Sequence, residues 1–155
     1  MIGNQIIHLV SNPDKMVQEM HRVMKPGAIA YFSVLSDYSK STVFCSTRNI
    51  LEEYGYPTLS NFRSVFHLGK EESLEKVFPN YMFKTLGFEE FKVQIKPNEK
   101  MLSWLSLEIF EEFLYTFSKK YQNEIRERHA KMVEDFRTGK KEFCFYIRAI
   151  FVKKI

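Results

Sequence analysis

The sequence predicts an α/β fold built around an open sheet, and three of its segments carry that prediction. Residues 28–36 form an apolar stretch typical of a strand that is covered on both faces, as in a parallel sheet. An amphipathic pattern over residues 13–24 precedes this strand, and Lys25-Pro26-Gly27 ends that pattern. A helix that leads through a tight turn into a buried strand is an α/β crossover unit.

The first predicted helix has a well-defined start. Asn12 can accept a hydrogen bond as the N-cap, Pro13 is tolerated in a first turn, and Asp14 suits the positive end of the helix dipole. An apolar stripe at helical spacing follows this signature and predicts one amphipathic helix. The stripe consists of Met16, Val17, Met20, Val23 and Met24.

Two more helices are predicted in the middle of the chain. A second apolar stripe runs over residues 43–54, and Gly55 is expected to end it. Residues 56–68 are expected to form a loop. A further helix is predicted over about residues 70–86, with an interruption or kink at Pro79.

Two strands with helices between them complete the predicted elements. After Gly87, residues 88–95 alternate apolar and polar side chains, which is typical of a strand with one wet face or a place near the sheet edge. Residues 104–137 carry one long apolar stripe, which predicts two helices with a break near residues 118–122. Residues 142–152 are rich in β-branched and aromatic side chains and predict the last strand.

Composition places the chain among ordinary globular proteins. Of its 155 residues, 45% are hydrophobic and 27% are charged, which argues against disorder, and a net charge of +4 identifies no anionic partner. The longest apolar stretch, near residues 28–35, is far shorter than the ~20 residues that span a bilayer, so no membrane partner is expected. Cys45 and Cys144 have no metal-ligand spacing and form no disulfide framework. We therefore expect an intracellular protein of the cytoplasm that binds no metal.

The segment from His8 to Gly27, HLVSNPDKMVQEMHRVMKPG, resembles a known motif. Its order is His-Leu-Val, a Pro-Asp helix start, Arg22 before Val23, and then Lys-Pro-Gly and a strand. This order is similar to the motif after the fourth strand of class I S-adenosylmethionine-dependent methyltransferases of the small-molecule type. Ala28 stands where that family has a second glycine.

Later landmarks extend the resemblance over nearly the whole chain. They are Phe66-His67-Leu68, Leu86-Gly87-Phe88 before the sixth strand, and the segment from Phe145 to Val152 as the seventh strand. The resemblance implies a partial Rossmann-like methyltransferase sheet, from the end of the fourth strand to the seventh. Residues 1–155 would then be the C-terminal half of a single methyltransferase domain, with a helical insertion at about 100–138.

The implied function is S-adenosylmethionine-dependent methyl transfer to a small-molecule acceptor. The same resemblance places a glycine-rich turn after the first strand and an acidic ribose ligand after the second, and both would lie before Met1. The sequence contains no such glycine-rich run. The chain would therefore lack the main binding motif for S-adenosylmethionine, and its partner would be the missing N-terminal half or another chain.

Three residues near the start of the chain are candidates for the site that the resemblance implies. Gly3 and Asn4 would lie at the carboxyl end of the fourth strand and bind the cofactor, since an asparagine offers both a donor and an acceptor there. The alternative is that these two residues are only a turn. His8 would lie near the methyl-transfer cleft, although a lone histidine is more often a structural or surface residue than a base.

Aromatic residues supply the other candidates. Phe62, Phe66 and His67 would form a lid over the methyl acceptor, or the loop would simply pack onto the next helix. The aromatic stripe at residues 110–136 falls in the insertion that often shapes the acceptor pocket in this family, although a helical stripe is more often core.

No residue is predicted to be catalytic, and two other function classes remain open. An activated sulfonium needs mainly proximity and orientation, so methyl transfer requires no triad or carboxylate pair. One alternative is a non-catalytic partner or scaffolding half-domain that pairs through exposed strand edges. The other is a nucleic-acid binder that uses the basic residues of 119–141, but acidic residues alternate with these bases as on an ordinary solvated helix.

Overall fold

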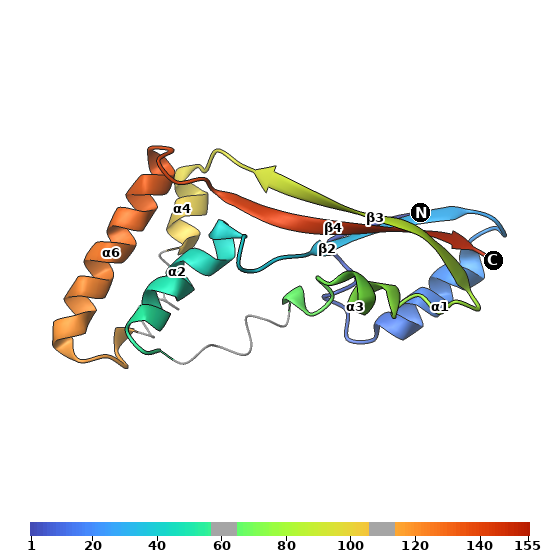
Figure 1. Ribbon diagram of the computed structural model, residues 1–155, viewed down its shortest axis with the longest axis horizontal. Helices are drawn as coiled ribbons and strands as arrows, with labels where there is room; N and C mark the ends of the chain where they lie inside the picture. The colour runs from blue at the N-terminus through green and yellow to red at the C-terminus, as the bar shows by residue number, and fades with distance from the viewer. Residues whose placement is uncertain (57–64, 106–113) are drawn as a thin grey trace. The chain divides into compact units, whose positions relative to one another are not determined.

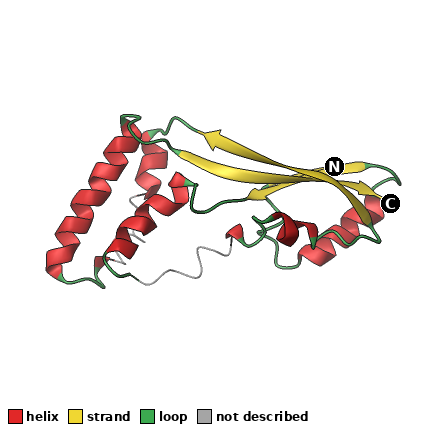
Figure 2. Ribbon diagram, in the orientation of Figure 1, coloured by secondary structure: helices red, strands yellow, loops and turns green. Residues whose placement is uncertain are grey.

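The computed structural model describes residues 1–56, 65–105 and 114–155 (Figure 1). These residues form a mixed sheet and helices, as Figure 2 shows. In chain order the elements are β1 (Ile2–Asn4), α1 (Pro13–Val23), β2 (Ile29–Leu35), α2 (Thr42–Glu53), α3 (Glu71–Glu75), β3 (Phe83–Gln94), α4 (Glu99–Leu105), α6 (Lys119–Arg137) and β4 (Cys144–Lys154).

The sheet has the strand order β1-β2-β4-β3. Strand β1 runs parallel to β2, with Gly3 opposite Phe32. Strand β4 runs antiparallel to β2 and pairs with every residue of β2, with Ile150 opposite Phe32. The predicted strand at residues 28–36 is therefore an interior strand, and the strand predicted near the sheet edge is indeed the edge strand β3. The last strand in the sequence, β4, lies inside the sheet.

Helix α1 and strand β2 form the crossover unit that the sequence predicts. The Asn12 carboxamide oxygen accepts a hydrogen bond from the Lys15 amide at 2.9 Å, so Asn12 is the N-cap, and Pro13 occupies the first turn. After the helix, Gly27 adopts a φ of +75°, a left-handed conformation that glycine takes without a Cβ clash. This turn delivers the chain directly into β2.

The chain divides into two compact units, and the first consists of Met1–Tyr38, Ser60–Lys92 and Tyr146–Ile155. Its core lies between helices α1 and α3 and one face of the sheet, where alternate residues of β2 pack. The core includes Val17, Met20, Ala30, Phe32, Val34, Leu74, Phe78, Phe83, Ile150 and Val152.

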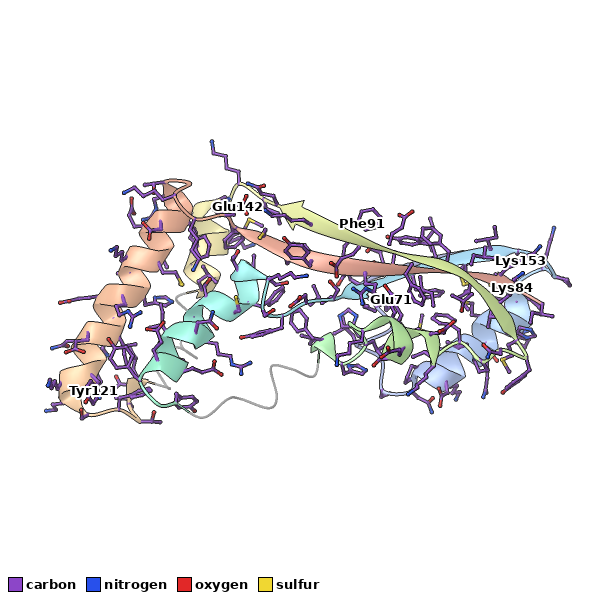
Figure 3. The ribbon with its side chains drawn as sticks, in the orientation of Figure 1. Glu71, Lys84, Phe91, Tyr121, Glu142 and Lys153 are labelled. Atoms are coloured by element: carbon purple, nitrogen blue, oxygen red, sulfur yellow. The ribbon has the colours of Figure 1, made fainter. Side chains whose placement is uncertain are left out.

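The other face of this part of the sheet carries exposed apolar side chains, so the prediction that residues 28–36 are covered on both faces is wrong for the first part of β2. Ile29 and Tyr31 alternate with the core residues of β2 and therefore point to the opposite face. Ile2 pairs with Tyr31 and is 79% exposed, and Ile29 is 53% exposed. Phe91 of β3 is also exposed, and it is labelled in Figure 3.

The second unit consists of Ser39–Leu59 and Val93–Phe145. The described helices α2, α4 and α6 enclose its core, and the predicted aromatic stripe contributes Ile125, Met132 and Phe136 to that core. These residues are buried packing residues, as the alternative interpretation of the stripe expected. The two phenylalanines that begin the stripe, Phe110 and Phe113, lie outside the described residues.

The prediction of one helix over residues 70–86 is wrong. Helix α3 ends at Glu75, and the amides of Met82 and Phe83 donate to the Pro79 carbonyl in a turn. Strand β3 then begins at Phe83, four residues before Gly87, where the sequence placed the strand's start. The Phe83 ring packs edge-on against His21 of α1, with ring centroids 5.4 Å apart, and this tertiary contact favours the extended conformation over helix.

The predicted break in the long helical segment is confirmed at its C-terminal side. Helix α6 begins at Lys119, directly after Ser118. Helix α4 begins at Glu99, five residues earlier than the sequence pattern indicated. An ion pair between Arg137 of α6 and Glu99 joins the first residue of α4 to the last residue of α6, with a distance of 3.0 Å.

At Gly69 the backbone of a neighbouring segment leaves no room for a side chain. A Cβ atom there would lie 2.1 Å from the Ser36 carbonyl oxygen, which belongs to the backbone at the end of β2. We expect Gly69→Ala to lower the free energy of unfolding by about 3 kcal/mol, because backbone must move to admit the methyl group. Urea denaturation measures this loss. Gly55→Ala is the control, since nothing lies within 4 Å and only its φ of +85° is strained, which costs about 1 kcal/mol.

Candidate functional site

The carboxyl ends of β1 and β2 lie at the same edge of the sheet, because these two strands are parallel and Asn4 pairs with Ser33. In open α/β sheets, ligands bind outside the carboxyl ends of the strands. The segment that ends at Gly69 passes against the end of β2 at Ser36. Residues from three separate stretches of sequence therefore meet at this edge.

Gly3 and Asn4 have different surroundings. Gly3 is buried, and a Cβ atom would lie 2.3 Å from Cε1 of Phe32, so packing of this ring already requires a glycine. Asn4 is exposed, and its Oδ1 accepts a hydrogen bond from Ser33 Oγ at 2.6 Å. Both residues belong to strand β1, so the alternative that they are only a turn is wrong, and Asn4 presents a polar side chain at the strand end.

Gln5 is a residue that sequence reasoning missed. It has a φ of +53°, the one positive φ among the described residues other than glycine. Its amide donates to the Ser33 carbonyl at 3.0 Å, while its side-chain Nε2 is buried without a hydrogen-bond partner. The backbone conformation costs about 1 kcal/mol or more, and an unpaired buried donor costs about 1–3 kcal/mol. Backbone strain and an unsatisfied donor together are typical of functional residues.

His8 is buried, with 8% of its surface exposed, and its Nδ1 atom has no hydrogen-bond partner. Burial lowers the pKa of His8 below the usual histidine value, and the nearby His67 lowers this pKa further. The structure thus brings two of the predicted site residues, His8 and His67, into electrostatic contact. At neutral pH the His8 imidazole is uncharged and can both donate and accept a hydrogen bond.

The aromatic lid predicted from the sequence is only partly within the described structure. The Phe66 ring is half-buried and packs edge-on against Tyr38, with the ring centroids 5.2 Å apart. His67 is exposed next to it. Phe62 lies outside the described residues, so its predicted role in the lid stays a prediction.

A polar network holds the end of β2. Glu90 Oε1 accepts hydrogen bonds from Ser36 Oγ and from Arg148 Nη2, each at 2.9 Å. Arg148 Nε is buried with no partner. The polar residues Ser33 and Ser36 in an otherwise apolar stretch were the signal in the sequence that could have identified this end of the strand.

The described residues show neither a metal site nor a membrane span. No group of three or more His, Cys, Asp or Glu side chains in this part of the chain could hold a metal ion. Cys45 and Cys144 are free, buried thiols, and burial raises the pKa of Cys45. None of the described helices is both long and apolar enough to cross a membrane.

No protein-family profile matches this sequence, and no curated protein is similar to it at a significant level. Among solved structures, phosphoethanolamine N-methyltransferase 2 of Haemonchus contortus, with phosphomonomethylethanolamine and S-adenosylhomocysteine, is 15% identical over 99% of this chain and 32% of its own, with a TM-score of 0.39. The same enzyme with S-adenosyl-L-methionine gives 16% identity and a TM-score of 0.36 over 99% and 32% of the two chains. The [4+2]-cyclase SpnF is 14% identical over 99% of this chain and 48% of its own, with a TM-score of 0.39.

The chain thus spans about a third to a half of the length of these proteins. Two of the three structures are complexes of the same methyltransferase. At these TM-scores the likenesses carry no argument about activity. The sheet itself defines the class: the described elements form a mixed, open α/β sheet of the partial Rossmann-like kind that the sequence predicts. If β1 is counted as the fourth strand, then β4 is the seventh and lies between the fifth and the sixth.

The buried His8 makes stability depend on pH. Its pKa is lowered in the folded chain, so below the ordinary histidine pKa of about 6.5 the unfolded chain takes up a proton that the folded chain does not. We expect the free energy of unfolding to fall between about pH 7 and pH 5.5. Urea titrations at several pH values measure this slope. His8→Phe should flatten it, whereas a control His21→Gln on α1 should leave the His8 contribution in place, and an unchanged slope in His8→Phe would contradict the assignment.

Proposed function

We propose that this chain is the C-terminal half of a class I S-adenosylmethionine-dependent methyltransferase domain and takes part in methyl transfer to a small-molecule acceptor. One observation supports the proposal most strongly. The segment that resembles the family's motif folds as a capped helix, a Gly27 turn and an interior strand, as that motif requires. The same segment begins beside unpaired polar atoms of Gln5 and His8 at the carboxyl end of β1.

The residues at this edge fit one part of the cofactor. Asn4 is exposed at the strand end and would contact the amino-acid part, while Gly3 would let the backbone approach. S-adenosylmethionine supplies a methyl group that is already activated on its sulfonium. The chain's own contribution is therefore to bind and orient, and we assign no catalytic residue.

The acceptor would lie next to His8. His67 acts on the neutral His8 imidazole, and the half-buried Phe66 ring precedes His67 in the chain; we propose that Phe62 completes this acceptor site. A buried neutral histidine and aromatic surface favour a small organic acceptor over a highly charged one. Groups that bind the adenosine would come from the missing N-terminal half.

The first test is cofactor binding by the chain alone. We expect S-adenosylmethionine to bind weakly or not at all, because the glycine-rich turn and the acidic ribose ligand supply most of the polar contacts. Isothermal titration calorimetry measures the affinity. Low-micromolar binding by this chain alone would contradict the half-domain proposal. An upstream coding sequence with a glycine-rich strand-turn-helix, whose product restores binding, would support it.

A second candidate function is a non-catalytic partner or scaffolding half-domain. The open sheet face favours it, because Ile2 and Ile29 are 79% and 53% exposed there and β1 ends the sheet as an edge strand. Exposed edges and apolar faces recruit other chains. The two candidate functions predict different cofactor binding. A methyltransferase half would bind S-adenosylmethionine once the N-terminal half is added, whereas a scaffold would pair with its partner chain and bind no S-adenosylmethionine.

We expect the purified chain to be oligomeric, aggregated or molten unless the missing half or a substitute partner covers this face. A few hundred Å² of wet apolar surface forfeits several kcal/mol at roughly 25 cal/mol per Å², which is comparable to a domain's stability of about 5–15 kcal/mol. Sedimentation velocity measures the oligomeric state of the chain, and thermal melts show whether it unfolds cooperatively. Ile29→Lys should shift the population toward monomer, while Val23→Lys, at a similarly exposed site on α1, should not. A compact wild-type monomer with a sharp transition would favour the scaffold.

A further inference from the structure

The turn after β1 contains a side chain that the fold itself does not use. Ser33 makes two hydrogen bonds in this turn. Its carbonyl accepts from the Gln5 amide at 3.0 Å, and its hydroxyl donates to Asn4 Oδ1 at 2.6 Å. The Gln5 side chain takes no part in this arrangement, and its Nε2 atom is buried without a partner. A glycine would adopt the φ of +53° without strain and would bury no amide. The turn alone therefore does not explain a glutamine at this position.

The chemistry of this atom defines what it can bind. A carboxamide nitrogen is a donor only, so its missing partner is an acceptor atom. Residues 1–13 contain no aspartate or glutamate, so the turn itself offers no side-chain carboxylate to repel an anion. A carboxylate oxygen would gain a charge-assisted hydrogen bond here, which is shorter and stronger than a bond between neutral groups.

We propose that Gln5 is a ligand-binding residue whose Nε2 donates a hydrogen bond to a carboxylate oxygen of a ligand at the carboxyl ends of β1 and β2. Two sources share this chemistry: the amino-acid carboxylate of the cofactor, which rests on the proposed function, and a carboxylate of the methyl acceptor or another ligand. The structure keeps the unpaired donor and the left-handed backbone in the same residue, and His8, three positions further along the chain, also has an unpaired atom, Nδ1. The strain at Gln5 is stored at a binding site.

Side-chain amide signals in ¹⁵N NMR spectra of the chain test the proposal. If the chain alone is oligomeric, the chain completed by its cofactor-binding half replaces it. The Gln5 signals are assigned by their loss in Gln5→Gly. The probes are S-adenosylhomocysteine, 5′-methylthioadenosine, which lacks the amino-acid carboxylate, and acetate, all at millimolar concentration. Gln122 is the internal control, because its Nε2 already donates to the Phe117 carbonyl at 2.8 Å.

We expect acetate to shift the Gln5 signals in the chain alone, and S-adenosylhomocysteine to shift them when the cofactor-binding half is present. Methylthioadenosine should have no effect on these signals, and no probe should shift the Gln122 signals. Gln5→Gly should weaken S-adenosylhomocysteine binding by about 10–100-fold, as the loss of one hydrogen bond to a charged group does. It should also raise Tm by about 2–4 °C, because the strain disappears. Gln5→Asn, which keeps an amide and tolerates a positive φ, should retain part of the stability gain but not the affinity.

Each outcome has a defined meaning. In the completed domain, shifts with acetate but not with S-adenosylhomocysteine support the Gln5 site and count against the cofactor as its source, and thus against the proposed function. Shifts with both support the site and the cofactor. No shift of Gln5 with any probe, or an unchanged affinity in Gln5→Gly, overturns the Gln5 proposal whatever happens to Tm, while calorimetry on the completed domain still tests the proposed function separately.

Discussion

Strand β2 is hydrogen-bonded along both edges, and this pairing positions the candidate site. The parallel partner β1 places Asn4 beside Ser33, so that two strand ends open at one edge of the sheet. The antiparallel partner β4 places Arg148 opposite Val34, from where its guanidinium reaches Glu90. Alternation along the same strand sends Ala30, Phe32 and Val34 into the core formed with α1 and α3. Strand β2 thus contributes to the core and also positions the polar groups at its own end.

The crossover unit could be predicted because its signals are local. A cap at Asn12, a proline at position 13 and a glycine at position 27 each determine the conformation of their own neighbourhood, and all three lie where the sequence placed them. The segment around Pro79 could not be predicted in the same way. Its apolar residues suit a helix as well as a strand, and the packing of Phe83 against His21 of α1 favours the strand. Because that contact is tertiary, it leaves no periodic pattern in the sequence.

The candidate site was predictable in outline and not in its details. Counting from the resemblance put Asn4 and His8 near one strand end, and the structure brings His8 and His67 into electrostatic contact. The role of Gln5 depends on a left-handed φ that glutamine rarely adopts, so no pattern of residue types announces it. The closeness of Gly69 to Ser36 joins segments more than thirty residues apart, and only the folded chain reveals it.

The order of strands has a consequence for how the chain can fold. Strand β3 is made before β4, but its only neighbour in the described sheet is β4, which ends at the penultimate residue, Lys154. In the described sheet, β3 can therefore pair with a neighbouring strand only after β4 has been synthesised. The pairing of β2 with β4 joins residues more than a hundred positions apart, and such non-local contacts form slowly. During translation one edge of β2 stays unpaired until β4 emerges, and the pairing of β4 then completes the described sheet.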